Sequence, residues 1–354
     1  MKVLEVENLK TFFKTDNGVV KAVRDISFFL EQREILGIVG ESGSGKSVSM
    51  FSILGLLARN GYIGQGRINF DGQELLNVCA EKEFCDLSYL KKIKKQYEKQ
   101  MTSYRGKDIG IIFQDPMTYL NPILTVGYQM SESLKRHFNY SNAECKKKNK
   151  LMLETVGITN AEKRLKQYPF ELSGGMRQRV MIAMALTSNP RLLIADEPTT
   201  ALDVTIQAQI LELMKSLQQS SDMSIILITH DLGVVASMCT RIIIMYGGQI
   251  MEEGTDREIF YQHRHPYTSG LLKSIAKYEE NREDKPIKLV PIEGSPPDLL
   301  QPPQGCAFVD RCEQAMTVCK HFEPQTIQLS STHRCKCFLC YPQVNKLMEE
   351  SNHG

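Results

Sequence analysis

The part of this 354-residue chain that could do chemistry is a glycine-rich octapeptide near its start. It reads GESGSGKS from Gly40 to Ser47 and fits the pattern G-x-x-x-x-G-K-S. An apolar run over 34–40 precedes the loop, and a second run over 47–57 follows it. Between a strand and a helix, the backbone N–H groups of such a loop converge on phosphate oxygens. We therefore expect a nucleoside-triphosphate site here.

The roles within this loop follow from the chemistry of each residue. We expect Lys46 to pair with the β- and γ-phosphates and the Ser47 hydroxyl to ligate Mg²⁺. The loop's remaining nucleotide-binding positions are Gly40, Ser42, Gly43, Ser44 and Gly45.

A second apolar strand ends in two carboxylates. The run LLIADE begins at Leu192 and places Asp196 and Glu197 at its end. The strand would deliver Asp196 to the Mg²⁺ ion, and Glu197 would polarise the attacking water. The two carboxylates and the glycine-rich loop together predict hydrolysis of ATP.

The heptapeptide LSGGMRQ, residues 172–178, predicts a second place for phosphate. Ser173, Gly174 and Gly175 precede an amphipathic helix, whose start can bind an anion. The heptapeptide resembles the LSGGQ signature of the ABC-transporter ATPases, with Met176 in place of the signature glutamine. Two phosphate sites and one Mg²⁺ pair in a chain suggest a site shared across a dimer. The resemblance implies that the signature of one subunit closes over ATP held by the other.

Other family positions match residue by residue. Gln114 resembles the glutamine that contacts Mg²⁺ or water and senses the membrane partner, and Asp203 resembles the aspartate of the D-loop. His230 resembles the histidine that bridges the γ-phosphate and the catalytic glutamate. Phe13, or its neighbour Phe12, occupies the region of the aromatic residue that stacks on adenine. Plain core packing is the alternative for that ring.

Two further segments narrow the resemblance to one branch of the family. FQDPMTYLNP, residues 113–122, and HPYTSGLL, residues 265–272, resemble segments of the oligopeptide, dipeptide and nickel importer ATPases. This implies a peripheral ATPase at the cytoplasmic face of the cell membrane that energises peptide import. The implied partners are a second ABC ATPase in a hetero- or homodimer, two transmembrane permease subunits and an extracytoplasmic solute-binding protein. Import of nickel or another small solute, a soluble non-transport ABC ATPase and an exporter are alternatives.

Six of the ten cysteines lie between residues 306 and 340. Four of them have the spacing C-x₅-C-x₆-C-x₁₇-C and could ligate Zn²⁺ or an iron–sulfur cluster. The tail resembles the cysteine region of the D-type importer subunit, which favours a [4Fe–4S] cluster. A zinc site built on Cys335, Cys337 and Cys340 and a tail of reduced, metal-free cysteines are alternatives. The four cysteines assigned to the cluster are Cys306, Cys312, Cys319 and Cys337.

Composition excludes several classes of protein. Hydrophobic residues make up 42% of the chain, so a large core is expected, and the net charge of +2 does not predict binding to nucleic acid. The N-terminus alternates apolar and charged residues, unlike a signal peptide. No uninterrupted apolar stretch reaches the roughly 18 residues of a membrane span. We expect a soluble, intracellular chain that meets the membrane through its partners.

The pattern of elements predicts how these residues are positioned. Buried strands alternate with helices, which is typical of an α/β core with a mainly parallel sheet. Residues 241–246 and 249–254 predict a hairpin, 120–188 a helical insertion, and the Lys-rich segment 77–107 a solvated loop and helix. We expect an ABC-type P-loop NTPase core with an antiparallel β subdomain and a small cysteine-containing extension. The predicted domains are a nucleotide-binding domain, residues 1–255, and a C-terminal extension, residues 256–354.

Overall fold

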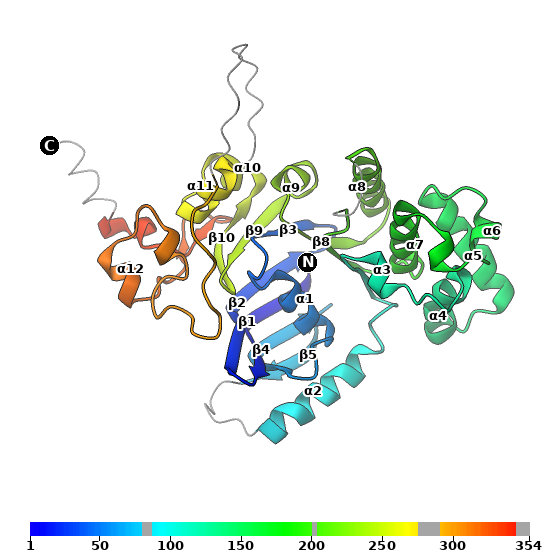
Figure 1. Ribbon diagram of the computed structural model, residues 1–354, viewed down its shortest axis with the longest axis horizontal. Helices are drawn as coiled ribbons and strands as arrows, with labels where there is room; N and C mark the ends of the chain where they lie inside the picture. Colours follow the sequence, from blue (N-terminus) through cyan, green and yellow to red (C-terminus); the bar gives the residue numbers. More distant parts are fainter. Residues whose placement is uncertain (80–86, 200–203, 275–290, 345–354) are drawn as a thin grey trace, which may run out of the picture.

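The computed structural model describes residues 1–79, 87–199, 204–274 and 291–344, which form two sheets (Figure 1). The larger sheet has the order β11-β12-β10-β9-β3-β8-β7-β6, and the smaller has the order β2-β1-β4-β5. The larger sheet contains β3 (Ile35–Val39), β6 (Ile109–Ile112), β7 (Leu192–Asp196), β8 (Ser224–Thr229), β9 (Arg241–Tyr246), β10 (Gln249–Thr255), β11 (Ile327–Gln328) and β12 (Arg334–Cys335). The smaller sheet contains β1 (Lys2–Thr15), β2 (Gly18–Glu31), β4 (Gly61–Phe70) and β5 (Gln73–Val78).

Five strands of the larger sheet are parallel, namely β9, β3, β8, β7 and β6. Strands β3, β7 and β8 are buried along their whole length, as expected for strands covered on both faces. Their carboxyl ends meet at one edge of the sheet. That edge therefore brings together the glycine-rich loop after β3, Asp196 at the end of β7 and His230 after β8.

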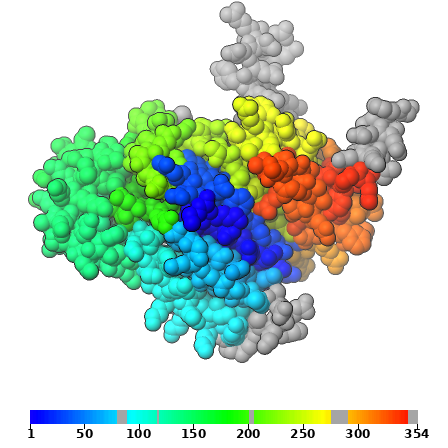
Figure 2. Space-filling model, turned by 180° about the vertical axis from the view of Figure 1, so that it is seen from behind, coloured from blue at the N-terminus to red at the C-terminus, as the bar shows by residue number. Residues whose placement is uncertain are grey.

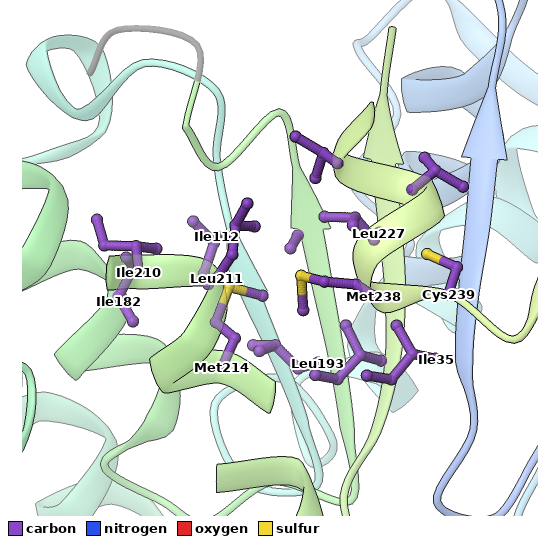
Figure 3. Close-up of a cluster of buried hydrophobic side chains, with 14 of the residues drawn as sticks. Ile35, Ile112, Ile182, Leu193, Ile210, Leu211, Met214, Leu227, Met238 and Cys239 are labelled. Carbon is purple, nitrogen blue, oxygen red and sulfur yellow. The ribbon is translucent and has the colours of Figure 1, made fainter. Parts of the chain in front are cut away.

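Helices cover both faces of this sheet. Helix α1 (Lys46–Leu54) lies between it and the smaller sheet, where the hydroxyls of Thr11 and Ser52 are 2.8 Å apart. On the other face, helices α8 (Val204–Gln219) and α9 (Leu232–Met238) pack against the strands. Figure 3 shows Met214 of α8 and Met238 of α9 in the same buried cluster as Leu193 of β7.

A group of helices follows β6 and forms one end of the molecule (Figure 1). It confirms the predicted helical insertion, although the first short helix begins at Pro116. Thr125 caps one of its helices, and Ser141 with Glu144 forms a capping box on the next. We call this set the helical group: α3 (Pro116–Tyr119), α4 (Val126–Phe138), α5 (Asn142–Thr155), α6 (Ala161–Arg164), the 3₁₀ helix Pro169–Glu171 and α7 (Gly174–Leu186).

The Lys-rich segment is less solvated than its composition predicts. Helix α2 (Leu87–Met101) turns one apolar face onto the smaller sheet and α1, burying Leu90, Tyr97 and Met101. The Tyr97 hydroxyl also donates to the carbonyl of Ile53 at 2.5 Å. Helix α2 is amphipathic, but its many lysines make the segment look polar when its composition is considered as a whole.

The predicted extension is joined to the larger sheet. After β10 come α10 (Asp256–Tyr261) and α11 (Pro266–Lys273), and later β12 pairs with β10 while β11 pairs with β12. The remaining elements are α12 (Thr317–His321) and the 3₁₀ helices Val309–Arg311 and Phe338–Cys340. Figure 2 shows the N-terminal strands (blue) between the helical group (green) and the extension (orange to red). The division at residue 255 stays a prediction.

No helix in the part of the chain that the structure describes is long and apolar enough to cross a membrane.

Candidate nucleotide site and thiol pocket

Two positions of the glycine-rich loop can be occupied only by glycine. Gly45 has φ +98° and directly precedes α1, so its left-handed backbone suits the turn into the helix. At Gly40, an added Cβ would lie 2.1 Å from the carbonyl oxygen of Met245 in β9. The loop is thus wedged between the sheet and the start of α1, where N–H groups lack intrahelical partners.

Lys46 is buried inside this loop. Its Nζ donates to the carbonyl of Gly40 at 2.7 Å and to that of Glu41 at 2.9 Å. Burial lowers the pKa of Lys46, and the carboxylates of Glu197 and Asp196 oppose that shift. A cation held among carbonyls and carboxylates suits a phosphate, which would compete for the same ammonium group.

Asp196 and Ser47 are brought together as a divalent cation requires. The Ser47 hydroxyl donates to the Asp196 carboxylate, while burial raises the pKa of Asp196. The Oδ1 atom of Asp196 is buried and has no hydrogen-bond partner among the described residues. A hydroxyl and a free carboxylate oxygen side by side are the ligand type that Mg²⁺ prefers, so these residues fit the expected ion.

The carboxylate of Glu197 is held from two sides. Gln114 donates from Nε2 to its Oε2 at 2.7 Å, and Nδ1 of His230 lies 3.1 Å from its Oε1. Glu197 has φ +45°, a backbone conformation that is uncommon outside glycine and that costs free energy. Its N–H bonds to the carbonyl of Ile228 at 2.9 Å, which fixes the turn after β7. The three side chains predicted to act in hydrolysis are therefore in contact.

The signature segment starts a helix, as expected. Ser173 caps α7 and accepts a hydrogen bond from the N–H of Met176. A Cβ on Gly174 would meet nothing within 4 Å, so this turn is open to an incoming group. Gln178 is buried and donates to the carbonyl of Pro198, which connects α7 to the end of β7. The sharing of this segment across a dimer stays a prediction.

Two predicted nucleotide-binding residues stay untested. The ring of Phe13 lies over Gly61 of β4, where an added Cβ would be 2.6 Å from the ring. Adenine stacking by Phe13 therefore stays a prediction, as does its core-packing alternative. Asp203 falls outside the described residues.

Two residues outside the predicted site contact its glycine-rich loop. The Tyr267 hydroxyl accepts a hydrogen bond from the N–H of Glu41 at 3.0 Å. Arg311 donates from Nη1 to the carboxylate of Glu41 at 2.7 Å. Tyr267 belongs to the HPYT segment, but no local pattern marks either contact because the partners are far apart in the chain.

The four cysteines assigned to a cluster line one small pocket in the extension, which we call the thiol pocket: Cys306, Cys312, Cys319 and Cys337. Burial raises the pKa of Cys306 to about 11 and also raises the pKa of Cys312 and Cys337. The structure therefore brings the four side chains to one pocket, and their role as cluster ligands stays a prediction. No group of three or more His, Cys, Asp or Glu side chains within the described ranges is placed to hold a metal ion.

His265 also lines the thiol pocket. Its Nδ1 accepts a hydrogen bond from the N–H of Tyr267 at 3.0 Å, so the ring proton resides on Nε2. Nε2 is buried and has no partner among the described residues. Burial lowers the pKa of His265 to about 4. The buried carboxylate of Glu252 accepts from the N–H of His265 at 3.1 Å and from His333 at 2.8 Å, which ties both parts of the extension to β10.

A phosphate-binding loop facing a cation ligand and an oriented carboxylate, all at one edge of a parallel sheet, is the arrangement of a P-loop nucleoside triphosphatase. Comparison with known proteins narrows this class. The family model described as ABC transporter matches residues 23–200, and that described as the C-terminal region of oligopeptide/dipeptide transporters matches residues 251–319. The chain belongs to the ABC transporter family, in which it is an ATP-hydrolysing subunit.

Curated relatives match almost the whole chain. It is 50% identical to the oligopeptide transport ATP-binding protein OppD of Bacillus subtilis, covering 98% of this chain and 91% of the relative. It is 51% identical to the dipeptide transport ATP-binding protein DppD of the same organism, and the match covers 96% of this chain and 95% of the relative. The solved structure of the dimeric ATP-binding cassette MJ0796 bound to ADP and phosphate superposes with a TM-score of 0.59 at 27% identity. The match covers 72% of this chain and 99% of that chain. These matches confirm the expected P-loop fold class.

Proposed function

We propose that this chain binds Mg·ATP, hydrolyses it and uses the cycle to energise peptide import. The observation that carries the proposal is the placement of Glu197 beside Gln114 and His230 at the edge that also holds Lys46. Lys46 leaves its carbonyl partners and pairs with the phosphates. Glu197 then orients a water for attack on the γ-phosphorus and accepts its proton, while His230 keeps the carboxylate in position.

The predicted nucleotide contacts complete the proposed site. Ser47, Asp196 and Gln114 would hold the Mg²⁺ ion, which would neutralise charge on the phosphates. Ser173, Gly174 and Gly175 close over the ATP of a second ABC ATPase subunit, with Asp203 at the same interface. ATP favours the closed dimer because only the closed state makes both sets of contacts.

Peptides are the proposed cargo because of the relatives' names. Matched proteins are called oligopeptide and dipeptide transport ATP-binding proteins, and the match extends through the C-terminal region. The proposed assembly adds two transmembrane permease subunits and an extracytoplasmic solute-binding protein. The chain is then a peripheral subunit at the cytoplasmic face. Nickel or another small solute is the alternative cargo.

Uptake of labelled dipeptides, longer peptides and Ni²⁺ tests this proposal in cells that lack the chain. The parental chain and the Lys46→Ala variant are returned to those cells separately. We expect loss of peptide uptake, restored by the parental chain alone. Loss of Ni²⁺ uptake instead would support the alternative cargo, and normal uptake of every solute would contradict an importer role.

We further propose that the thiol pocket holds a [4Fe–4S] cluster. A single Zn²⁺ needs its sulfur ligands about 2.3 Å from one point, and no described group is placed in that way. The ligands of a four-iron cluster bind separate iron atoms and so stand further apart. The four thiols that line one pocket match the number of ligands of such a cluster. Cys335, Cys337 and Cys340 also pack together, so a zinc site there is the alternative.

Two features of the pocket agree with an anionic, sulfur-rich group. Buried thiols with raised pKa values stay protonated unless a metal stabilises their thiolates. The unpartnered Nε2–H of His265 lines the same pocket and can donate to sulfur. A cluster bound there would supply a structural crosslink and one-electron redox chemistry.

A further inference from the structure

The second residue of the glycine-rich loop is held by the extension. The carboxylate of Glu41 pairs with Arg311 at 2.7 Å, and its N–H donates to the Tyr267 hydroxyl at 3.0 Å. Its carbonyl accepts from Lys46 at 2.9 Å and from the N–H of Ser44 at 3.2 Å. Glu41 therefore connects two residues of the extension to the phosphate-binding lysine.

Arg311 is rigid enough to position the loop. Its side chain is 5% exposed, and it makes bonds from all three guanidinium nitrogens. Nε donates to the carbonyl of Glu293 at 2.8 Å, Nη2 to that of Ile292 at 3.0 Å, and Nη1 also to the Tyr246 hydroxyl at 3.2 Å. A guanidinium group that is fixed in this way loses little side-chain entropy when it pairs with a carboxylate.

The Tyr267 hydroxyl is placed by an aromatic cluster. The ring of Tyr267 lies 4.6 Å from that of Tyr246 and 5.2 Å from that of Phe308, and Tyr267 is fully buried. Tyr246 ends β9, whereas Phe308 belongs to the extension. The contact to the loop thus depends on packing between the sheet and the extension.

The charge of Glu41 makes its pairing important for nucleotide binding. An unpaired carboxylate next to a phosphate-binding loop repels phosphate, and partial burial strengthens that repulsion. Arg311 neutralises the carboxylate without occupying the loop. A loop with this charge neutralised and its backbone held is prepared for phosphate.

We propose that Arg311 and Tyr267 are positioning residues of the nucleotide site, so that the C-terminal extension sets the affinity of the glycine-rich loop for nucleotide. The proposal goes beyond hydrolysis of ATP and needs neither a cluster nor a particular cargo. The 3₁₀ helix that ends at Arg311 is followed by Cys312, so the thiol pocket directly adjoins this contact.

Nucleotide affinity of the full chain tests the proposal, with a fluorescent ATP analogue and Mg²⁺ as the probe. We expect Arg311→Met to raise Kd roughly three- to tenfold, which lies at the lower end of the coupling seen between neighbouring residues. Adding Glu41→Gln to Arg311→Met should recover part of the lost affinity, because it removes the unpaired charge. Tyr267→Phe, which deletes only the hydroxyl, should raise Kd to a smaller extent. This variant takes the place of Arg311→Met in the test if Arg311→Met does not fold.

Arg334→Met is the matched control. Arg334 also ties the extension to the sheet, through Glu253 of β10, but has no contact with the loop. Melting temperatures without nucleotide are measured for every variant. The proposal is overturned if Arg311→Met and Tyr267→Phe bind nucleotide like the parental chain. It also fails if Arg334→Met weakens binding equally, or if Glu41→Gln recovers none of the affinity.

Discussion

Gln114 and Glu197 are joined by a 2.7 Å hydrogen bond between Nε2 and Oε2, although they follow different strands. Gln114 comes after β6, where the chain leaves the sheet for the helical group, and Glu197 comes after β7. A shift of the helical group would therefore move the donor that orients the hydrolytic carboxylate. This gives a physical route by which a partner bound to the helical group could influence hydrolysis.

Replacing His230 by Ala should slow ATP hydrolysis and leave nucleotide binding almost intact. Nδ1 of His230 lies 3.1 Å from Glu197, and its loss frees one side of the carboxylate. We expect the hydrolysis rate to fall roughly tenfold or more, since small misplacements of a catalytic group are costly. Steady-state phosphate release and nucleotide Kd measure the two effects. The control is His321→Ala, an exposed side chain at the end of α12. An unchanged rate in His230→Ala would remove His230 from the mechanism.

Replacing Cys312 by Ser should lower the iron and acid-labile sulfide content of the purified chain. Cys312 lines the thiol pocket with three other thiols, and each thiolate of a four-cysteine cluster holds one iron. Protein purified without oxygen is assayed for iron, sulfide and visible absorbance. Cys340→Ser is the control, because Cys340 lies in the extension outside the assigned set. Equal iron content in the parental chain and both variants would sink the cluster assignment.

Replacing His265 by Asn should make the reduction potential of the cluster more negative. Asn is a good helix N-cap and can still accept from the N–H of Tyr267, but it lacks the Nε2–H donor. Hydrogen bonds to cluster sulfur help set the reduction potential. The reduced cluster carries more negative charge than the oxidised one, so the loss of a hydrogen-bond donor destabilises the reduced cluster and makes the potential more negative. Redox titration followed by electron paramagnetic resonance measures the shift. His265→Phe, which fills the space without a donor, should shift it in the same direction. Unchanged potentials in both variants, at full iron content, would refute the His265 contact while leaving the cluster in place.

Glu258 should contribute to stability at neutral pH and lose that contribution in acid. Partial burial raises its pKa, but hydrogen bonds from Ser330, Thr255 and Thr332 outweigh burial and lower the pKa to about 2. The ordinary value is 4.5, so the contribution is complete above that pH and disappears as pH falls toward 2. After solvent screening it should be on the order of 1 kcal/mol.

Denaturant unfolding of the parental chain and Glu258→Gln at pH 7, 5 and 3 tests this dependence. The difference in the free energy of unfolding between the parental chain and Glu258→Gln should be similar at pH 7 and 5 and smaller at pH 3. Glu154→Gln, on the exposed side of α5, is the control. A difference that grows toward acid would show that the sign is wrong.

Local sequence predicted the elements whose chemistry lies within a short segment. The loop before Lys46 and the strand before Asp196 each combine an apolar run with a chemically distinctive end, so both the element and the role could be predicted. The four cysteines assigned with the help of the family resemblance line one pocket, and their role as cluster ligands stays a prediction. Placement of Gln114 and His230 near Glu197 needed the family resemblance, because nothing local pairs them.

Long-range contacts could not be predicted. Arg311 and Glu41 are 270 positions apart, and neither has a neighbouring pattern that indicates the other. The same holds for Glu252 and His333, which join β10 to the extension. The buried face of α2 was hidden by lysines whose charged ends stay in water while their neighbours pack. These features depend on how the sheets and the extension assemble.

The most direct test of the account compares ATP hydrolysis by the parental chain and Glu197→Gln. The substitution keeps the size of the side chain and an oxygen that can accept from Gln114, but it removes the capacity to accept a proton. The account predicts a loss of roughly a hundredfold or more in the hydrolysis rate, with nucleotide Kd close to the parental value and closed dimers accumulating in ATP. Hydrolysis at the parental rate would contradict the assignment of Glu197 as the base.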